Sequence, residues 1–243
     1  MSVADFEKLD TYYRSLPKYG SVTGKCAMSL PANLDGKRVL DVFCRAGKGA
    51  YELSDHVGAG GFVMGVDVDE GRMERARINA PMNHAAGEDW ERNLSFRQGF
   101  PETVSEIIPD EQMFDVVYIN SAINFVFSLE WALIEFHSVL RSDGYLWIAQ
   151  GIFADRDDGA VASEVSHLDT RVGEDGLAYS AEPGFGNVFA RALSPDDFRS
   201  HCLAAGFSDV RFGKVSPIVP DGHDAMESLQ GRRFITCDVC ALG

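Results

Sequence analysis

The sequence predicts an α/β fold in which helices cover both faces of a mostly parallel sheet. Short apolar runs, typical of buried parallel strands, alternate along the chain with segments whose apolar residues recur at helical spacing. In residues 37–69, a strand at 39–42 leads through a glycine-bearing turn and a helix to a second strand that ends on Asp67. Such a turn presents backbone N–H groups at a helix N-terminus, and an acid in this place accepts hydrogen bonds from ribose hydroxyls. The layout therefore predicts a site for a nucleotide-type cofactor.

The composition limits the class of protein. With 243 residues, 45% hydrophobic and 24% charged, the chain is long enough for one globular domain with a cap. Its formal charge of −15 repels phosphates and argues against nucleic acid as a partner. No apolar run approaches the ~20 residues of a membrane helix, so no membrane partner is expected. Five cysteines, an odd number at irregular spacing, indicate reduced thiols and a cytoplasmic protein.

The remaining elements follow from the same patterns. An amphipathic helix is predicted over 5–16, where Tyr12 and Tyr13 are candidates for a lid over the cofactor, with plain packing of the helix as the alternative. A serine N-cap followed by a proline predicts that a further helix starts at Ser194. The other predicted elements are helices at 50–57, 70–79 and 128–140 and strands at 62–66, 94–99, 114–120, 145–149, 207–215 and 234–242.

Residues 151–192 break this periodicity and are rich in Asp, Gly and Glu. Because such a stretch is too long for a plain connection and follows a strand, we interpret it as a substrate cap. The whole chain, 1–243, is then a single domain with a lid segment at 1–33. The polar residues of the cap with chemical reach, each of which has a solvated loop position as its alternative, are His167, Arg171, Tyr179 and Arg191.

The turn after the first strand resembles a known motif. VLDVFCRAG, at 39–47, resembles the first motif of class I S-adenosylmethionine-dependent methyltransferases: Asp41 and Gly47 match it, and Phe43 and Arg45 stand where its first two glycines would be. HSVLRSDGYLWIA, at 137–149, is similar to a helix–turn–strand signature of the same enzymes. The resemblance implies a Rossmann-like sheet of seven strands with an antiparallel last strand, and S-adenosyl-L-methionine as the cofactor.

The resemblance also implies roles for residues. Asp67 holds the ribose, Gly47 the turn, and Asn120 the reacting end of the cofactor. Glu102 is either an adenine contact or an acid at a helix N-terminus, and Arg45 either pairs with a carboxylate or points outward. The full set of implied cofactor contacts is Asp41, Phe43, Cys44, Arg45, Gly47, Asp67, Val68, Glu102, Asn120 and Tyr13, among which Cys44 is interpreted as a packing residue.

Several phrases resemble the arsenite methyltransferase branch. They are Tyr12-Tyr13 and the segments 120–124, 154–156 and 193–218. In that branch a substrate-binding cysteine lies upstream of the first motif, where this chain has Cys26. The candidate substrate contacts are accordingly Cys26, Asn124 and His167.

The cysteine set for arsenic is incomplete. Trivalent arsenic is normally held by several converging thiolates, and the chain has Asn187-Val188 where the branch carries its next cysteine. Cys237 and Cys240 are predicted on one strand with their side chains on opposite faces, as small buried hydrophobes. We therefore carry over the fold and the cofactor class, and not the arsenic substrate.

The sequence thus predicts a methyltransferase that transfers a methyl group from S-adenosylmethionine to an N, O or S atom of a small molecule. The alternative is a non-catalytic relative that keeps the fold, has lost or altered cofactor binding, and acts as a binding or regulatory partner; Phe43 and Arg45 motivate it. A nicotinamide-dependent oxidoreductase is disfavoured because G-x-G-x-x-G is missing after the first strand. The oligomeric state is left open between a monomer and a homodimer.

Overall fold

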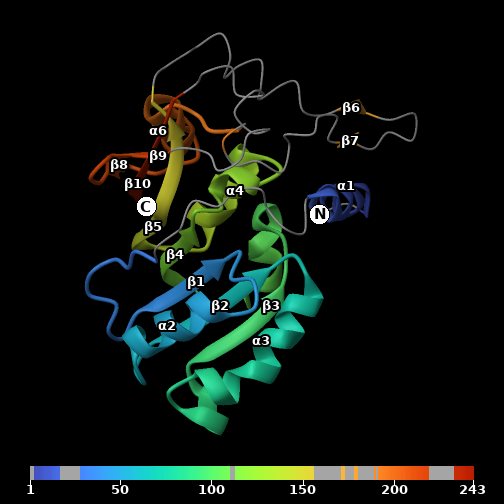
Figure 1. Ribbon diagram of the computed structural model, residues 1–243, viewed down its shortest axis with the longest axis vertical. Coiled ribbons are helices and arrows are strands. Elements are labelled where there is room, and N and C mark those ends of the chain that lie inside the picture. Colours follow the sequence, from blue (N-terminus) through green and yellow to red (C-terminus); the bar gives the residue numbers. More distant parts are fainter. Residues whose placement is uncertain are drawn as a thin grey trace.

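The computed structural model of the chain describes residues 3–16, 28–109, 113–155, 171–172, 178–179, 189, 191–218 and 233–243. Within these residues a central sheet carries helices on both faces, as the sequence predicts (Figure 1). Cys26 and His167, two of the predicted substrate contacts, lie outside the described residues, as do Asn187 and Val188.

The elements alternate along the chain much as predicted. The helices are α1 (Val3–Ser15), α2 (Lys48–Val57), α3 (Glu70–Asn83), α4 (Leu129–Ser138) and α6 (Pro195–Ala204), with short 3-10 helices η1 (Gly87–Arg92), η2 (Pro101–Ile107) and η3 (Ile123–Phe125). The strands are β1 (Arg38–Val42), β2 (Phe62–Asp67), β3 (Leu94–Gln98), β4 (Phe114–Asn120), β5 (Leu140–Ala154), β6 (Arg171–Val172), β7 (Ala178–Tyr179), β8 (Asp209–Phe212), β9 (Ser216–Ile218) and β10 (Phe234–Leu242).

Seven strands of the sheet lie in the order β3-β2-β1-β4-β5-β10-β8, and β9 also pairs with β10. The pairs from β3 to β5 are parallel, whereas β10 runs antiparallel to β5, β8 and β9. This confirms the predicted mostly parallel sheet with an antiparallel last strand. The single strand predicted at 207–215 is instead split into β8 and β9, because its pairing with β10 shifts by one residue: Phe212 lies opposite Val239, whereas Ser216 lies opposite Thr236.

Alternate residues of the inner strands face two separate apolar cores, as expected for a sheet that is covered on both sides. Leu40 of β1 belongs to the core that includes Phe136 of α4 and Phe198 of α6. Its neighbour Val39 belongs to the core under α2 and α3, with Leu53. Both faces therefore hold β1 in place, and the turn that leaves its carboxyl end starts from a rigid support.

Several boundaries differ from the sequence prediction. β5 begins at Leu140, so it includes residues that were predicted as the end of a helix and the turn after it. The helix predicted at 70–79 continues to Asn83, and Pro81 lies inside it, close enough to the end that the missing N–H removes only one bond of the last turn. The first residues of the segment predicted as a cap, from 151, belong to the sheet instead, because β5 continues to Ala154 by pairing with the first half of β10, where Gly151 lies opposite Cys237. Pairing between distant segments overrides the local loss of periodicity there.

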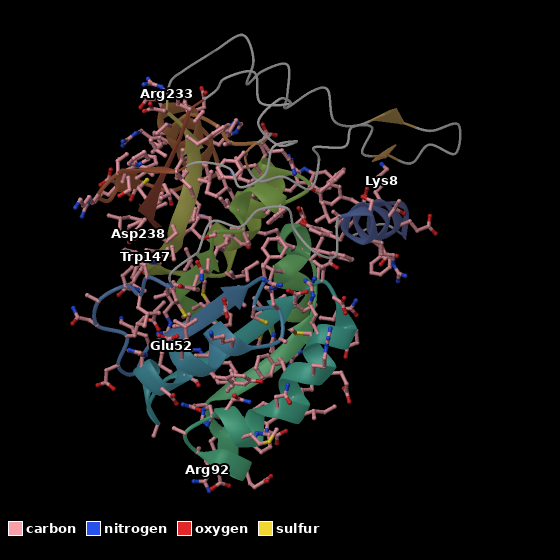
Figure 2. The ribbon with its side chains drawn as sticks, in the orientation of Figure 1. Lys8, Glu52, Arg92, Trp147, Arg233 and Asp238 are labelled. Atoms are coloured by element: carbon pink, nitrogen blue, oxygen red, sulfur yellow. The ribbon has the colours of Figure 1, made fainter. Side chains whose placement is uncertain are left out.

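The segment that leads into β1 is fastened to the sheet. The carbonyl of Ser29 accepts hydrogen bonds from the Tyr118 hydroxyl and from the Trp147 indole, both at 3.1 Å. The Ser29 hydroxyl in turn donates to the Asp238 carboxylate at 2.6 Å. Figure 2 labels Trp147 and Asp238, which lie close together on β5 and β10. The chain is thus fixed to three strands a few residues before it enters β1.

Candidate functional site

The turn between β1 and α2 keeps the backbone of a glycine motif although two of its glycines are replaced. The φ angle is +60° at Phe43, +54° at Arg45 and +86° at Gly47. This left-handed conformation costs a residue with a Cβ roughly 1–2 kcal/mol. The surroundings of Phe43 and Arg45 must therefore impose the positive φ angles on them. A further side chain at Gly47 would lie 2.9 Å from the Tyr51 ring, which explains why this glycine is retained.

Hydrogen bonds to β2 impose the shape of the turn. The N–H of Cys44 donates to the carbonyl of Val66 at 3.0 Å, and the N–H of Arg45 donates to the Asp67 carboxylate at 3.0 Å. The Arg45 side chain is exposed, so of the two alternatives for this residue the structure shows the outward one. Phe43 is half-buried, and its ring centroid lies 6.1 Å from that of Tyr13 on α1.

Asp67, the acid at the end of β2, is buried and fully engaged. One carboxylate oxygen accepts from the N–H of Arg45, and the other accepts from the N–H of Asp69 at 3.1 Å and from the Arg72 guanidinium at 3.3 Å. Burial raises the pKa of Asp67, and the charge of Arg72 and the two N–H donors oppose that rise. The Asp67 side chain has no exposed surface, whereas 28% of the Arg72 side chain is exposed. Arg72 is therefore the one partner of Asp67 that can move away into solvent.

Cys44 lies in the same turn, and Asp41 lies on β1 just before it. One oxygen of the Asp41 carboxylate is buried and has no hydrogen-bond partner among the residues that the structure describes. Burial and the nearby charge of Asp67 raise the pKa of Asp41 well above its usual value. Burial likewise raises the pKa of the Cys44 thiol well above its usual value, and its sulfur lies 3.9 Å from the sulfur of Met73. Cys44 thus packs as a neutral thiol, whereas Asp41 retains capacity to bind a polar group.

Glu102 joins three parts of the chain. Its carboxylate accepts the Tyr13 hydroxyl at 2.9 Å and the backbone N–H groups of Phe127 and Ser128 at 2.7 and 3.2 Å. Glu102 lies in the first turn of η2, but its partners belong to α1 and to the segment that enters α4. Burial raises the pKa of Glu102 to about 7. That it contacts adenine stays a prediction.

Aromatic side chains close the space between α1 and the turn. The Tyr13 ring stacks on Phe100 with centroids 5.5 Å apart. Phe43, Val68 and Phe127 are partly buried against this cluster. Five of the predicted cofactor contacts, which come from four parts of the sequence, therefore lie in two adjoining groups: Asp67 with Arg45, and Tyr13 with Glu102 and Phe43.

The two predicted asparagines lie at the end of β4, which Asn120 closes, and in the segment after it, which carries Asn124. Asn120 accepts the Ser121 hydroxyl at 3.2 Å, and Ser121 has a φ of +54°. Asn124 donates from its side chain to the carbonyl of Ile152 at 3.0 Å. Asn124 also lines a small cavity of about 30 Å³ together with Ile123, Leu129, Phe153, Arg191, Leu193 and Phe198. A space of that size holds about one water, and of the two asparagines Asn124 is the one among its described lining residues.

A family model described as a methyltransferase domain matches residues 33–175, the part of the chain that contains β1 to β5 and the turn after β1. The chain belongs to this family. The match confirms the resemblance to class I S-adenosylmethionine-dependent methyltransferases.

This methyltransferase-family chain is similar to arsenite methyltransferases along most of its length. It is 30% identical over 209 residues to the arsenite methyltransferase of Aquipseudomonas alcaligenes, and this alignment covers 86% of this chain and 55% of the relative. It is 29% identical over 124 residues to that of Mus musculus, covering 51% of this chain and 33% of the relative. The chain thus spans about half the length, or less, of these curated relatives.

Solved structures show the same fold. An arsenic(III) S-adenosylmethionine methyltransferase from Chlamydomonas reinhardtii superposes with a TM-score of 0.69 at 23% identity, covering 97% of this chain and 73% of that one. The YcgJ protein of Bacillus subtilis gives a TM-score of 0.57 at 18% identity, covering 85% and 91%. Among the described helices, none has both the length and the apolar character to cross a membrane.

The sequence did not predict the contacts that two residues of this methyltransferase-family site make. Arg72 holds Asp67, and a usable signal existed, because it lies in the first turn of α3, five positions after the acid. Arg191 was predicted only as a polar residue of the cap, yet its guanidinium donates to the Tyr12 hydroxyl at 2.7 Å. No local pattern announces a contact between residues 179 positions apart.

Proposed function

We propose that this chain binds S-adenosylmethionine and transfers its methyl group to a small-molecule acceptor. The observation that carries the proposal is the turn of Phe43, Arg45 and Gly47, which keeps left-handed φ angles at all three motif positions and is fixed to Asp67. Membership of the methyltransferase domain family supports the same reading. Hydrogen bonds to Val66 and Asp67 hold the turn in this shape without glycine at Phe43 and Arg45, so the two larger residues leave the backbone of the proposed cofactor turn in place.

The residues of the site fit the cofactor with one rearrangement. Asp41 has a buried oxygen beside the turn that meets no hydrogen-bond partner in the described part of the chain, which suits a polar group of the ligand. Asp67 has the chemistry to accept ribose hydroxyls once the exposed side of Arg72 turns away. Gly47 fixes the turn, Glu102 and Val68 face the adenine side, and Asn120 faces the reacting end in this proposal. The bound cofactor supplies an electrophilic methyl group on a sulfonium.

The chain contributes position and desolvation to such a transfer, and it needs few acids or bases. The aromatic cluster of Tyr13, Phe43 and Phe100 excludes water from one side of the site. Rigid strands hold Asp41 and Asp67. These features favour a nucleophilic N, O or S atom that is presented by a small molecule and aligned by the protein.

For the acceptor, the relatives' names suggest arsenic, but the described cysteines do not supply converging thiolates. Cys44 lies in the turn, Cys202 on α6, and Cys237 and Cys240 on β10. Burial raises the pKa of each of these thiols, to about 12 for Cys202 and about 11 for Cys237. We therefore propose an acceptor that requires no site of several protein thiolates.

Cys26 stays the predicted substrate thiol, and a substitution tests it. Methyl transfer is assayed with arsenite in excess glutathione and, in parallel, with panels of small thiols, phenols and amines. If the wild type methylates arsenite and Cys26→Ser does not, thiol binding of arsenic is retained. Equal turnover of both proteins on the preferred acceptor would discard thiol chelation by Cys26.

Calorimetric titration with S-adenosylmethionine and S-adenosylhomocysteine tests the cofactor. We expect saturable heat and a rise in melting temperature for the wild type, and neither for Asp67→Ala. Absence of both signals in the wild type would overturn the proposal.

A non-catalytic relative is the second candidate, and two observations favour it. The Asp67 carboxylate already has three donors and no exposed surface. Phe43 fills space against Tyr13 beside the turn. Such a protein would act as a binding or regulatory partner, and the same titration separates the two candidates, because the relative gives no heat with either ligand.

The wider organisation belongs to the proposal as well. We propose one domain over 1–243, in which 1–33 form the lid and 151–192 the substrate cap, in a cytoplasmic protein without a nucleic-acid or membrane partner. Light scattering on a gel-filtration column distinguishes a monomer from a homodimer.

A further inference from the structure

The guanidinium of Arg191 binds backbone carbonyls of the segment after β4. One terminal nitrogen donates to the carbonyl of Val126 and also lies 3.4 Å from the carbonyl of Asn124. The other donates to the carbonyl of Phe127 at 3.2 Å. Arg191 itself comes from the residues that lead into α6. It therefore connects the end of the predicted cap with the segment that carries Asn124.

The same guanidinium reaches the helix α1. It donates to the Tyr12 hydroxyl at 2.7 Å, and its central carbon lies 6.0 Å from the centre of the Tyr12 ring. The Tyr12 hydroxyl then donates to the carbonyl of Phe125 at 2.9 Å. Figure 2 shows α1, on which Lys8 is labelled, as an element at the side of the molecule. Among the described residues, Tyr12 and Tyr13 both join α1 to the body by side-chain hydrogen bonds.

The peptide groups of Phe127 are held from both sides. Its N–H donates to the Glu102 carboxylate at 2.7 Å, and its carbonyl accepts from Arg191 at 3.2 Å. The two charged groups bind the two tyrosines of α1 as well, Glu102 through Tyr13 and Arg191 through Tyr12. α1 and the segment after β4 are thus fastened together at two points of opposite charge.

We propose that Arg191 is a positioning residue, whose guanidinium fixes the segment 124–127 and the helix α1 as one closed unit over the site. A planar group with five N–H donors can serve several carbonyls and a hydroxyl at once, which an ammonium on a flexible stem cannot do in the same geometry. Arg191 does not touch the reacting atoms in this role. It sets where Asn124 lies and whether α1 covers the site. The consequence for methyl transfer rests on the proposed function, whereas the attachment of α1 to the segment 124–127 through Arg191 does not.

Hydrogen exchange of the full-length protein, followed by mass spectrometry, tests the proposal. For Arg191→Met we expect amides of α1 and of 123–128 to exchange at least tenfold faster than in the wild type, while those of β1 and β2 keep their rates. Tyr12→Phe, which removes only the hydroxyl, should also accelerate exchange in α1. This milder variant keeps the test decisive if Arg191→Met folds poorly.

Arg199 provides a matched control. Its guanidinium donates to the carbonyl of Val210 at 2.7 Å and lies 5.2 Å from the Phe212 ring, so it makes the same types of contact at the far edge of the sheet. Arg199→Met should accelerate exchange near 207–212 and leave α1 unchanged.

Three results would each overturn the positioning role of Arg191. The exchange rate of the α1 amides could stay unchanged in Arg191→Met, rise equally in Arg199→Met, or return to the wild-type rate in Arg191→Lys. The wild type is also titrated with S-adenosylhomocysteine alongside the hydrogen-exchange experiment. If the wild type does not bind that ligand, the proposed function fails, and the exchange result still decides the role of Arg191.

Discussion

The Tyr13 hydroxyl donates a hydrogen bond to the Glu102 carboxylate, with 2.9 Å to one oxygen and 3.0 Å to the other, across 89 positions of the chain. Both side chains are buried. Burial raises the pKa of both groups, to about 7 for Glu102 and well above the usual value for Tyr13. The bond joins α1 to the end of the sheet through a charge that is held away from water, so its loss is measurable.

Tyr13→Phe should lower the free energy of unfolding by about 1.5–3 kcal/mol, because the change removes a hydrogen bond to a buried charged group. Urea denaturation at pH 8 measures the effect. Tyr51→Phe is the control, since the Tyr51 hydroxyl donates to a neutral carbonyl, that of Ala76, at 2.6 Å. It should lower the free energy of unfolding by about 1 kcal/mol. A loss in Tyr13→Phe no larger than that of the control would show that the charge adds nothing.

Glu102→Gln should change how stability depends on pH. The pKa of Glu102 in the folded protein, about 7, lies above its ordinary value of 4.5. A group of this kind stabilises the fold most below pH 4.5, and that contribution is lost as the pH rises through 7. Glutamine does not ionise, so the stability of the variant relative to the wild type should rise between pH 5 and pH 8, by on the order of 3 kcal/mol.

Urea denaturation of both proteins at the two pH values gives this difference. Glu106→Gln, which removes the same charge from an exposed position on the same 3-10 helix, corrects for the change in net charge. A pH-independent difference between Glu102→Gln and the wild type would mean that Glu102 titrates as an ordinary surface acid.

The strands were predictable where the sequence is mostly apolar. Phe234–Leu242 was predicted to the residue, as was Phe114–Asn120, because apolar and β-branched residues predominate in both. Their places in the sheet were not readable from those runs. β10 lies between β5 and β8, so the last strand of the chain is not the last in space. The resemblance to a family implied that the last strand is antiparallel, but not that it lies between two other strands.

The place of Asp67 in the sheet could be predicted from the sequence, whereas the contacts around the turn could not. Asp67 follows from its place at the end of a strand, as the sequence suggested. The left-handed φ angles of Phe43 and Arg45 run against residue preference, and bonds to β2 impose them. The engagement of Glu102 by Tyr13 depends on distant packing, which no local spacing encodes.

Asp67→Asn should abolish binding of S-adenosylhomocysteine, because an amide retains one acceptor oxygen where the carboxylate offers two. Calorimetry measures binding, and far-UV circular dichroism verifies folding. Asp69→Asn is the control: Asp69 caps α3 by accepting from the N–H of Arg72 at 3.0 Å, and asparagine caps helices equally well. The control should therefore bind the ligand as the wild type does. Retained affinity in Asp67→Asn would remove Asp67 from the proposed ribose contact.

Arg45→Gly and Ala46→Gly should shift stability in opposite directions although they are adjacent. Arg45 has a φ of +54° and an exposed side chain, so glycine relieves backbone strain of roughly 1–2 kcal/mol with no packing lost. Ala46 is also exposed but has no positive φ, so glycine there only adds freedom to the unfolded chain and should destabilise by about 0.5–1 kcal/mol. Urea denaturation of the two variants measures both signs. Destabilisation by Arg45→Gly would mean that the arginine side chain itself holds the turn, and loss of S-adenosylhomocysteine binding in that variant would make the arginine a cofactor ligand.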